Sequence, residues 1–142
     1  MTARGNPCHL HQPEIHASTG FVFICPGRYE EKECRPCSGQ TGQELKDGLA
    51  HLHRLRPDWF PSVDRYDYLI TNAWDRVEYK AKTGRSMPTS VEVAVRRNVE
   101  RLYSEIARLD RVIACGEQAH LAVHLCTEFL GYSGVVAYTS HT

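Results

Sequence analysis

Short apolar runs alternate with helical patterns along this chain. Four of the runs are rich in β-branched and aromatic residues and have the length of buried strands. They are FVFIC at 21–25, YDYLIT at 66–71, RVIAC at 111–115 and GVVAYT at 134–139. Each run is therefore predicted to form one strand of a sheet.

Three segments between these runs carry apolar residues at helical spacing. Residues 42–55 and 88–109 each place an apolar stripe on one face, and a proline followed by hydroxyl residues opens the second segment. A third helical segment, residues 117–131, ends at Gly131. The two stripes consist of Leu45, Leu49, Leu52 and Leu55, and of Val91, Val95, Val99, Leu102 and Ile106.

Strands that alternate with helices favour parallel pairing through right-handed crossovers, with helices on both faces of the sheet. The predicted architecture is a three-layer α/β/α sandwich around a four-stranded, mostly parallel sheet. Residues 1–19 lack apolar periodicity and are expected to form a flexible polar arm. Residues 20–142 would then form the folded domain.

Composition and charge exclude only a few classes of protein. A chain of 142 residues is long enough for one domain with a real core, and no apolar run approaches the length of a bilayer span. The polar N-terminus lacks a signal-peptide core, so the expectation is a cytoplasmic, monomeric protein without a membrane partner. Lysine plus arginine and aspartate plus glutamate each total 17, which neither indicates nor excludes nucleic acid.

The cysteines allow two interpretations. Cys34 and Cys37 have C-x-x-C spacing, and Cys8 lies upstream near three histidines, but a single C-x-x-C pair is a weak zinc signal. The alternative is that the other cysteines pack as small apolar residues in the core. These are Cys25, Cys115 and Cys126. No metal and no cofactor is expected.

The ends of the predicted strands indicate where a ligand would bind. Open parallel sheets bind ligands beyond the carboxyl ends of their strands. Here those ends carry polar residues or glycine, which would meet at one edge of the sheet. They are Pro26-Gly27, Thr71-Asn72, Gly116 and Ser140-His141.

Six short motifs follow one another at these strand ends. In order they are CPGRYE, CRPCSGQTG, TN, RSMPTSVE, CGEQA and TSHT, and they extend across residues 21–142. In order and spacing the set resembles the uracil-DNA glycosylase superfamily, and in particular its iron–sulfur branch. The resemblance implies the sandwich described above. It also implies an enzyme that hydrolyses the N-glycosidic bond of a base flipped out of DNA and leaves an abasic site.

The resemblance also implies roles for particular residues. Asn72 matches the asparagine that reads the Watson–Crick edge of the flipped base, and His141 matches the histidine that donates to the base carbonyl as charge builds there. The alternatives are a turn residue for Asn72 and a surface histidine near the chain end for His141. Several glycines fall where the family backbone approaches DNA or the base, or else they serve ordinary turns. They are Gly27, Gly39, Gly42 and Gly116.

The chain departs from the family at the position of the catalytic acid. Ile24 and Cys25 stand where relatives carry a glutamate or an aspartate, and Gln40 stands where one branch has an aspartate. Glutamine can orient a water molecule but cannot take its proton. Glu30 and Glu31 are the candidates for activating water, with a solvated loop as the alternative for either.

A second departure concerns the shape of the expected pocket. Cys37 replaces the phenylalanine that stacks on uracil, which gives up roughly 1–3 kcal/mol of stacking but leaves room. The expected substrate is a pyrimidine bulkier than uracil, such as the modified bases of phage DNA, as would suit DNA repair or phage defence. The pocket walls would be Ile24, Cys25, Pro26, Cys37 and Gln40. The family's cluster cysteines are absent, which again predicts no cofactor.

Cations near the predicted strand ends would contact DNA phosphates without reading sequence. Arg28 and Arg35, together with Lys32, are candidates in the first loop, and solubilising loop charge is the alternative. The second loop adds Arg76, Lys80, Lys82 and Arg85. Two other functions remain open: a catalytically inactive module that binds a base or an abasic site, and a metal-dependent nucleotide hydrolase that uses the Cys/His residues.

Overall fold

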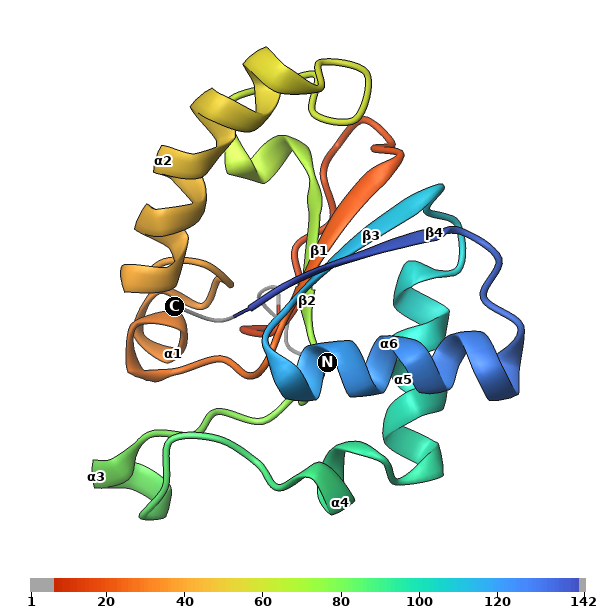
Figure 1. The fold of residues 1–142 in the computed structure, drawn as a ribbon. Coiled ribbons are helices and arrows are strands. Elements are labelled where there is room, and N and C mark those ends of the chain that lie inside the picture. The colour runs from red at the N-terminus through yellow and green to blue at the C-terminus, as the bar shows by residue number, and fades with distance from the viewer. Residues whose placement is uncertain (1–6, 141–142) are drawn as a thin grey trace.

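Four parallel strands form the centre of the molecule (Figure 1). The computed structural model describes residues 7–140. The sheet has the order β2-β1-β3-β4, and all three neighbouring pairs are parallel, which confirms the predicted α/β class. The strands are β1 (Thr19–Phe23), β2 (Leu69–Asn72), β3 (Arg111–Cys115) and β4 (Val135–Thr139).

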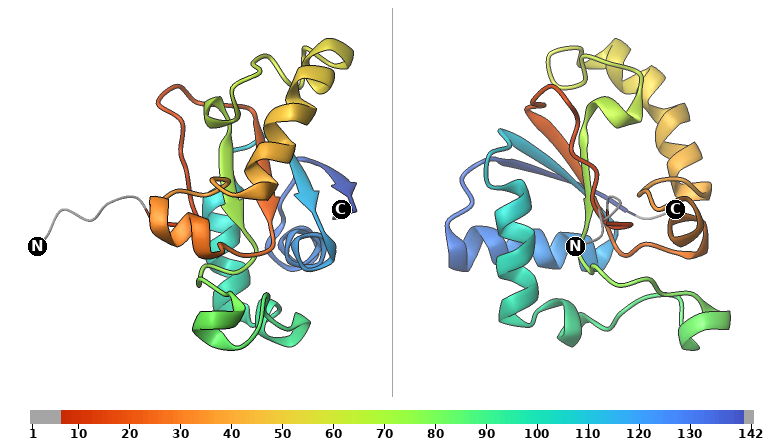
Figure 2. Two further views of the ribbon diagram at one scale, coloured as in Figure 1. Left: turned by 90° about the vertical axis from the view of Figure 1, so that its left-hand side faces the viewer. Right: turned by 180° about the vertical axis from the view of Figure 1, so that it is seen from behind.

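Helices cover both faces of this sheet (Figures 1 and 2). On one face α2 (Gln40–Leu55) packs over a core that contains Phe21, Leu49 and Ile113. On the other face α5 (Arg96–Ile106) and α6 (Glu117–Leu130) enclose a larger apolar cluster. The shorter helices are α1 (Arg28–Glu33), the 3-10 turn η1 (Arg65–Asp67), α3 (Lys80–Thr83) and α4 (Ser90–Val93). The three-layer arrangement is therefore as predicted.

The single helix predicted over 88–109 is wrong, because the chain forms α4 and α5 with a break between them. Val95 has an extended backbone, with ψ at 133°, and is the N-cap of α5. The side-chain amide of Asn98 donates to the carbonyl of Val93 at 2.8 Å, so the last carbonyl of α4 is paired. Val91 and Val95 of the predicted stripe are consequently 79% and 49% exposed.

Two strand boundaries also differ from the prediction. β1 begins at Thr19 and ends at Phe23, so Ile24 and Cys25 belong to the loop that follows it. Asp64 accepts a hydrogen bond from the Tyr66 backbone N–H at 2.9 Å and begins η1, which delays the start of β2 to Leu69. The loop predicted after β1 contains the six-residue helix α1.

Part of the predicted N-terminal arm is built onto the sheet. His11 and Ile70 exchange backbone hydrogen bonds of 2.8 and 3.0 Å as an antiparallel bridge on the outer edge of β2. Figure 2 shows this early segment beside β2. Leu10 packs against the core on the α5/α6 side of the sheet. The edge of β2 that does not pair with β1 is thus covered by residues near His11.

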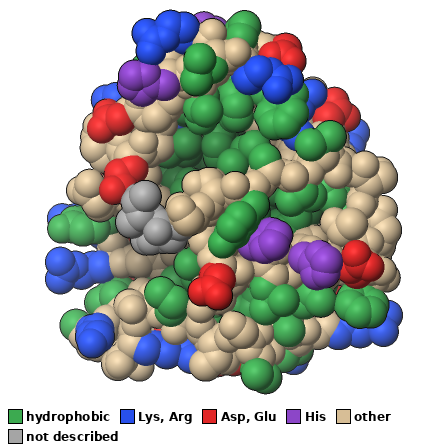
Figure 3. All heavy atoms as spheres, viewed as in Figure 1, with side chains coloured by type: hydrophobic (Ala, Val, Ile, Leu, Met, Phe, Trp, Pro, Cys, Tyr) green, Lys and Arg blue, Asp and Glu red, His purple; other side chains and the backbone are tan. Residues whose placement is uncertain are grey.

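An apolar recess of about 490 Å³ lies between α2 and the strands β1, β3 and β4. Figure 3 shows apolar side chains gathered in this hollow. Its walls include Leu45, Leu52 and Phe23. On β4, Val135 is 53% exposed, so α2 covers this face only in part.

Candidate functional site

A cavity of about 340 Å³ lies at the carboxyl ends of β1 and β2. Residues that the sequence motifs single out form much of its wall, and they come from the loop after β1 and from the end of β2. The lining consists of Phe23, Ile24, Cys25, Gly27, Glu30, Cys37, Thr41, Asn72, Ser86 and Met87. The structure thus brings together residues from separate motifs at the predicted edge of the sheet.

Backbone hydrogen bonds hold the two loops that form this cavity side by side. The N–H groups of Ala73 and Trp74 donate to the carbonyls of Phe23 and Ile24 at 2.8 and 3.0 Å. Pro26 is buried, and its carbonyl accepts the N–H of Glu78 at 3.0 Å. Pro26 therefore joins the two loops and does not itself line the cavity.

Glu30 lines the cavity, but its carboxylate is engaged by the loop. Oε1 accepts the N–H of Gly27 at 2.9 Å, and Oε2 accepts those of Ser38 and Gly39 at 3.0 and 2.9 Å. These bonds tie the start of α1 to the start of α2. A carboxylate has about four acceptor positions, so Oε1 keeps room for one more donor, such as water.

Glu31 points away from the cavity. Its oxygens accept hydrogen bonds from the Tyr79 hydroxyl at 2.9 Å and from the Lys82 ammonium at 2.5 Å. These two donors, with Lys82 the stronger, lower the pKa of Glu31. The pair fastens α1 to the segment after β2, and Glu31 is not among the lining residues.

Asn72 ends β2 with its side chain toward the cavity and is only 3% exposed. Its Nδ2 donates to the main-chain carbonyl of His9 at 3.0 Å. Its own carbonyl accepts a hydrogen bond of 2.9 Å from Arg101. Both contacts hold the end of β2 in place at the cavity wall.

The two cysteines of the cavity wall are neutral thiols at neutral pH. Burial raises the pKa of Cys25 to about 12 and raises that of Cys37 well above its usual range. A protonated thiol is a poor nucleophile and a poor metal ligand. Cys25 and Cys37 therefore line the cavity as small, weakly polar groups, as the wall interpretation expects.

A close backbone approach fixes the position of Cys37. It has φ of 55°, and a Cβ added to Gly42 would lie 1.8 Å from its carbonyl oxygen. That same oxygen accepts hydrogen bonds from the Tyr66 hydroxyl and from Arg65 Nε at 3.0 and 3.1 Å. Gly42 is buried in α2 and is required for the close packing of this helix against Cys37.

The remaining predicted site residues lie outside this cavity. Arg28, Gln40 and Gly39 line an adjoining groove of about 480 Å³ that shares Gly27, Glu30 and Thr41 with the cavity. The guanidinium of Arg35 stacks 3.3 Å from the centre of the Tyr66 ring, at a different cavity. Gly116 has φ of 99°, begins α6 and donates its N–H to Thr139. His141 lies outside the described residues.

Sequence reasoning missed Phe23, Thr41, Ser86 and Met87 of the lining. Ser86 and Met87 belong to a segment held by Arg85, which donates to Glu78 at 3.0 and 2.7 Å and to Glu92 at 2.6 and 3.1 Å. Hydrogen bonds from Arg85 lower the pKa of the buried Glu78 to about 2. The RSMPTSVE motif marked this segment but not the side chains that face the cavity.

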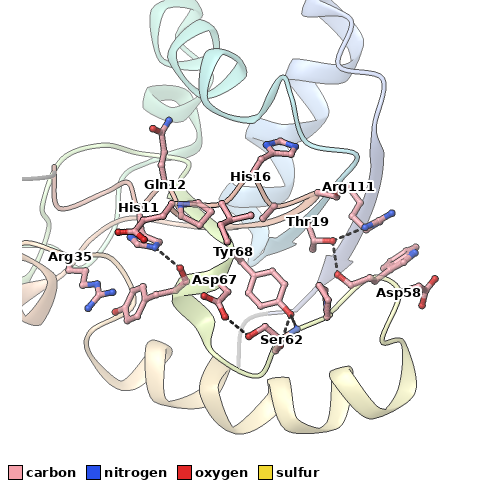
Figure 4. A pocket seen from close by; sticks show the side chains of 18 residues that line it. His11, Gln12, His16, Thr19, Arg35, Asp58, Ser62, Asp67, Tyr68 and Arg111 are labelled. Atoms are coloured by element: carbon pink, nitrogen blue, oxygen red, sulfur yellow. Dashed lines mark hydrogen bonds between the residues drawn. The ribbon is translucent and has the colours of Figure 1, made fainter.

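A larger cavity, of about 680 Å³, lies near the amino ends of β1 and β3 (Figure 4). Its buried polar residues are Thr19 and Tyr68. The Thr19 hydroxyl donates to the carbonyl of Trp59 and accepts from Arg111 at 2.9 Å. The Tyr68 hydroxyl both donates to and accepts from the backbone of Ser62. Both buried groups are thus satisfied within the protein.

Comparison with known proteins adds no family assignment. The sequence matches no family model and no curated protein. Among residues 7–140, no three His, Cys, Asp or Glu side chains are grouped so that they could hold a metal ion. In the same range no helix combines the length and the apolar character that crossing a bilayer requires. The geometry of the cavity therefore carries the functional argument.

Proposed function

We propose that the protein is a DNA glycosylase that binds a flipped-out pyrimidine in the cavity at the carboxyl ends of β1 and β2. The observation that carries the proposal is that one cavity is lined by residues from three separate segments of the chain, namely Ile24, Cys25 and Glu30, then Cys37, and then Asn72. A base in a duplex has to leave the stack before its glycosidic bond can be attacked. Pocket contacts then have to compensate for the lost pairing and stacking.

The residues that line this cavity suit a flipped-out base. Phe23 supplies an aromatic ring, the neutral thiols supply small apolar surface, and Asn72 supplies an amide for the polar edge. Cys37 in place of an aromatic residue leaves space beside the base. We therefore propose a substrate bulkier than uracil, such as a hydroxymethylated or glucosylated pyrimidine.

Glu30 has a role in this proposal that differs from proton abstraction. Cleavage of the glycosidic bond develops positive charge on the sugar, and a fixed negative charge nearby stabilises that charge. Three backbone N–H groups hold the Glu30 carboxylate in place, and one acceptor position remains for water. We assign Glu30 to orienting the water and to stabilising the sugar, and Glu31 to holding α1.

An excision assay tests the proposal. Duplexes containing uracil, 5-hydroxymethylcytosine or glucosylated 5-hydroxymethylcytosine are incubated with protein, and abasic sites are revealed by alkaline cleavage. Asn72→Ala is expected to slow base release about 10- to 100-fold, and Glu30→Gln about 100-fold, as for the loss of one transition-state contact. Glu31→Ala is the control, because Glu31 carries the same charge and lies in the same helix as Glu30. Its rate of base release should stay near that of wild type.

Base release confined to uracil would contradict the bulkier substrate. If no base is released from any of the three duplexes, the proposal of glycosylase activity is wrong.

A second candidate is a module of the same fold that binds a base or an abasic site without cutting. The observation that favours it is the engagement of both Glu30 oxygens by backbone N–H groups. Binding of the same duplexes by fluorescence anisotropy, with no base release, would support this module over the enzyme.

A further inference from the structure

The amide of Asn72 is oriented by His9, a residue of the N-terminal segment. Its Nδ2 donates to the main-chain carbonyl of His9 at 3.0 Å. A carbonyl oxygen accepts hydrogen bonds and cannot donate them, so it selects the amide nitrogen and turns Oδ1 away. His9 therefore determines which polar atom of Asn72 the cavity presents.

Oδ1 of Asn72 has no hydrogen-bond donor among the described residues. Within residues 7–140 it accepts no hydrogen bond, although Asn72 is only 3% exposed. In that same part of the chain, Arg101 Nε is the only sealed side-chain nitrogen or oxygen without a partner. Asn72 lines the cavity, and Oδ1 is the atom of its amide that no described residue engages.

His9 is itself anchored through its ring. Its Nε2 lies 2.8 Å from Oε2 of Glu105 on α5, and the two side chains are 12% and 10% exposed. The other oxygen of Glu105 accepts from the Thr71 hydroxyl at 2.6 Å and from Arg101 at 2.8 Å. Burial opposes ionisation of Glu105, but the donors, His9 foremost, leave its pKa lowered. The carboxylate thus joins the N-terminal segment, β2 and α5.

We propose that His9 and Glu105 are positioning residues of the cavity, which hold the Asn72 amide so that Oδ1 meets a hydrogen-bond donor on the base. This inference rests on the proposed function of the cavity. The donor would be a ring N–H or an exocyclic amine of the pyrimidine. A base with only acceptors on that edge would leave Oδ1 unpaired and facing another acceptor.

Base selectivity provides the first test. The probes are oligonucleotides carrying 5-hydroxymethyluracil or its N3-methyl derivative, since the methyl group removes the donor. Wild-type protein is expected to prefer the unmethylated base about tenfold, the size of one hydrogen bond. The preference should fall below about threefold in His9→Ala, in Asn72→Ala and in their double variant, with no further loss in the double variant.

Two further variants separate positioning from general stability. His9→Gln restores a side-chain donor for Glu105 and is expected to restore the preference. His16→Ala is the matched control, because His16 is an exposed histidine of the same segment. If His9→Ala keeps the wild-type preference, or if His16→Ala loses it equally, the inference is wrong.

A second test does not depend on DNA. The side-chain NH2 signals of Asn72, identified in a ¹⁵N–¹H spectrum by their loss in Asn72→Asp, should shift in His9→Ala and return in His9→Gln. If the signals do not change in His9→Ala, His9 does not position the Asn72 amide, and the glycosylase proposal is unaffected. A different result is that the NH2 signals shift in His9→Ala while the wild-type protein shows no preference among bases. That result would overturn the proposed function, and the proposed preference for a donor on the base with it.

Discussion

The two cavities at opposite ends of the strands differ in size and in the state of their polar groups. The larger one, about 680 Å³ at the amino ends, has its buried polar residues Thr19 and Tyr68 satisfied internally. The smaller one, about 340 Å³ at the carboxyl ends, contains the buried Asn72, whose Oδ1 accepts no hydrogen bond from residues 7–140. We propose the smaller cavity as the site because an acceptor without a described partner indicates ligand binding better than cavity volume does.

The largest effect is expected where the smaller cavity depends on close backbone packing. Gly42→Ala would place a Cβ 1.8 Å from the carbonyl oxygen of Cys37, so the loop would have to move. We expect a loss of more than about 4 kcal/mol in the free energy of unfolding, measured by urea denaturation.

Gly48→Ala in the same helix is the control. No atom lies within 4 Å of the added Cβ, so a gain of roughly 0.5–1 kcal/mol is expected. Equal stability of the two variants would show that the loop yields easily and that the cavity wall is not fixed by this contact.

A smaller effect is expected from the carboxylate that holds the cavity loop. Glu30→Ala leaves the N–H groups of Gly27, Ser38 and Gly39 without their partner. Water replaces part of the loss, so the free energy of unfolding should fall by about 2–3 kcal/mol. Glu31→Ala removes a partly exposed ion pair and should change thermal stability little. A larger effect at Glu31 than at Glu30 would reverse the roles assigned to them.

Unfolding at acidic pH tests whether the ion pair between Glu78 and Arg85 holds the segment that carries Ser86 and Met87. The pKa of Glu78 is lowered to about 2 by Arg85, so its contribution to stability is complete above the ordinary glutamate pKa. This contribution is lost as pH falls from about 4.5 toward about 2, and is about 1 kcal/mol after solvent screening at Arg85. Denaturation midpoints across this range should decline less steeply in Glu78→Gln than in wild type. If the midpoints decline equally steeply in Glu78→Gln and in wild type, the stabilising role assigned to ionised Glu78 is wrong.

The smallest effect is expected at the larger cavity. Arg111→Gln removes a hydrogen bond to Thr19 and a guanidinium 5.4 Å from the Trp59 ring centre. We expect about 0.5–1 kcal/mol of destabilisation and no change in base release or base binding. Impaired base binding in this variant with intact folding would break the distinction drawn between the two cavities.

The fold could be predicted where local pattern and burial agree. The strand at 111–115 was predicted with the right bounds, because its centre is fully buried and flanking turns delimit it. The helix over 88–109 was predicted wrongly, because valines at helical spacing continue across a break that the Asn98 side chain stabilises from the next helix. The capping Asn98 lies five residues after Val93 and leaves the spacing of the valines unchanged, so periodicity alone does not reveal the break.

The site could be located from sequence more readily than its chemistry. Strand direction and the glycine-containing motifs identified the edge where Asn72 and Cys37 now lie together. The state of Glu30 depends on three N–H groups brought together by folding, and the hydrogen bond between His9 and Asn72 joins residues 63 positions apart in the sequence. Neither relation follows from spacing along the chain.

The strand order has a consequence for how the protein is made. β1 is synthesised first but lies between β2 and β3, where Phe21 pairs with Ile70 and with Ile113. A chain emerging from the ribosome can complete neither side of β1 until much later residues have appeared. Because such distant contacts give a high contact order, we expect slow folding, in milliseconds to seconds. During that interval the apolar β1 would be a natural target for a chaperone.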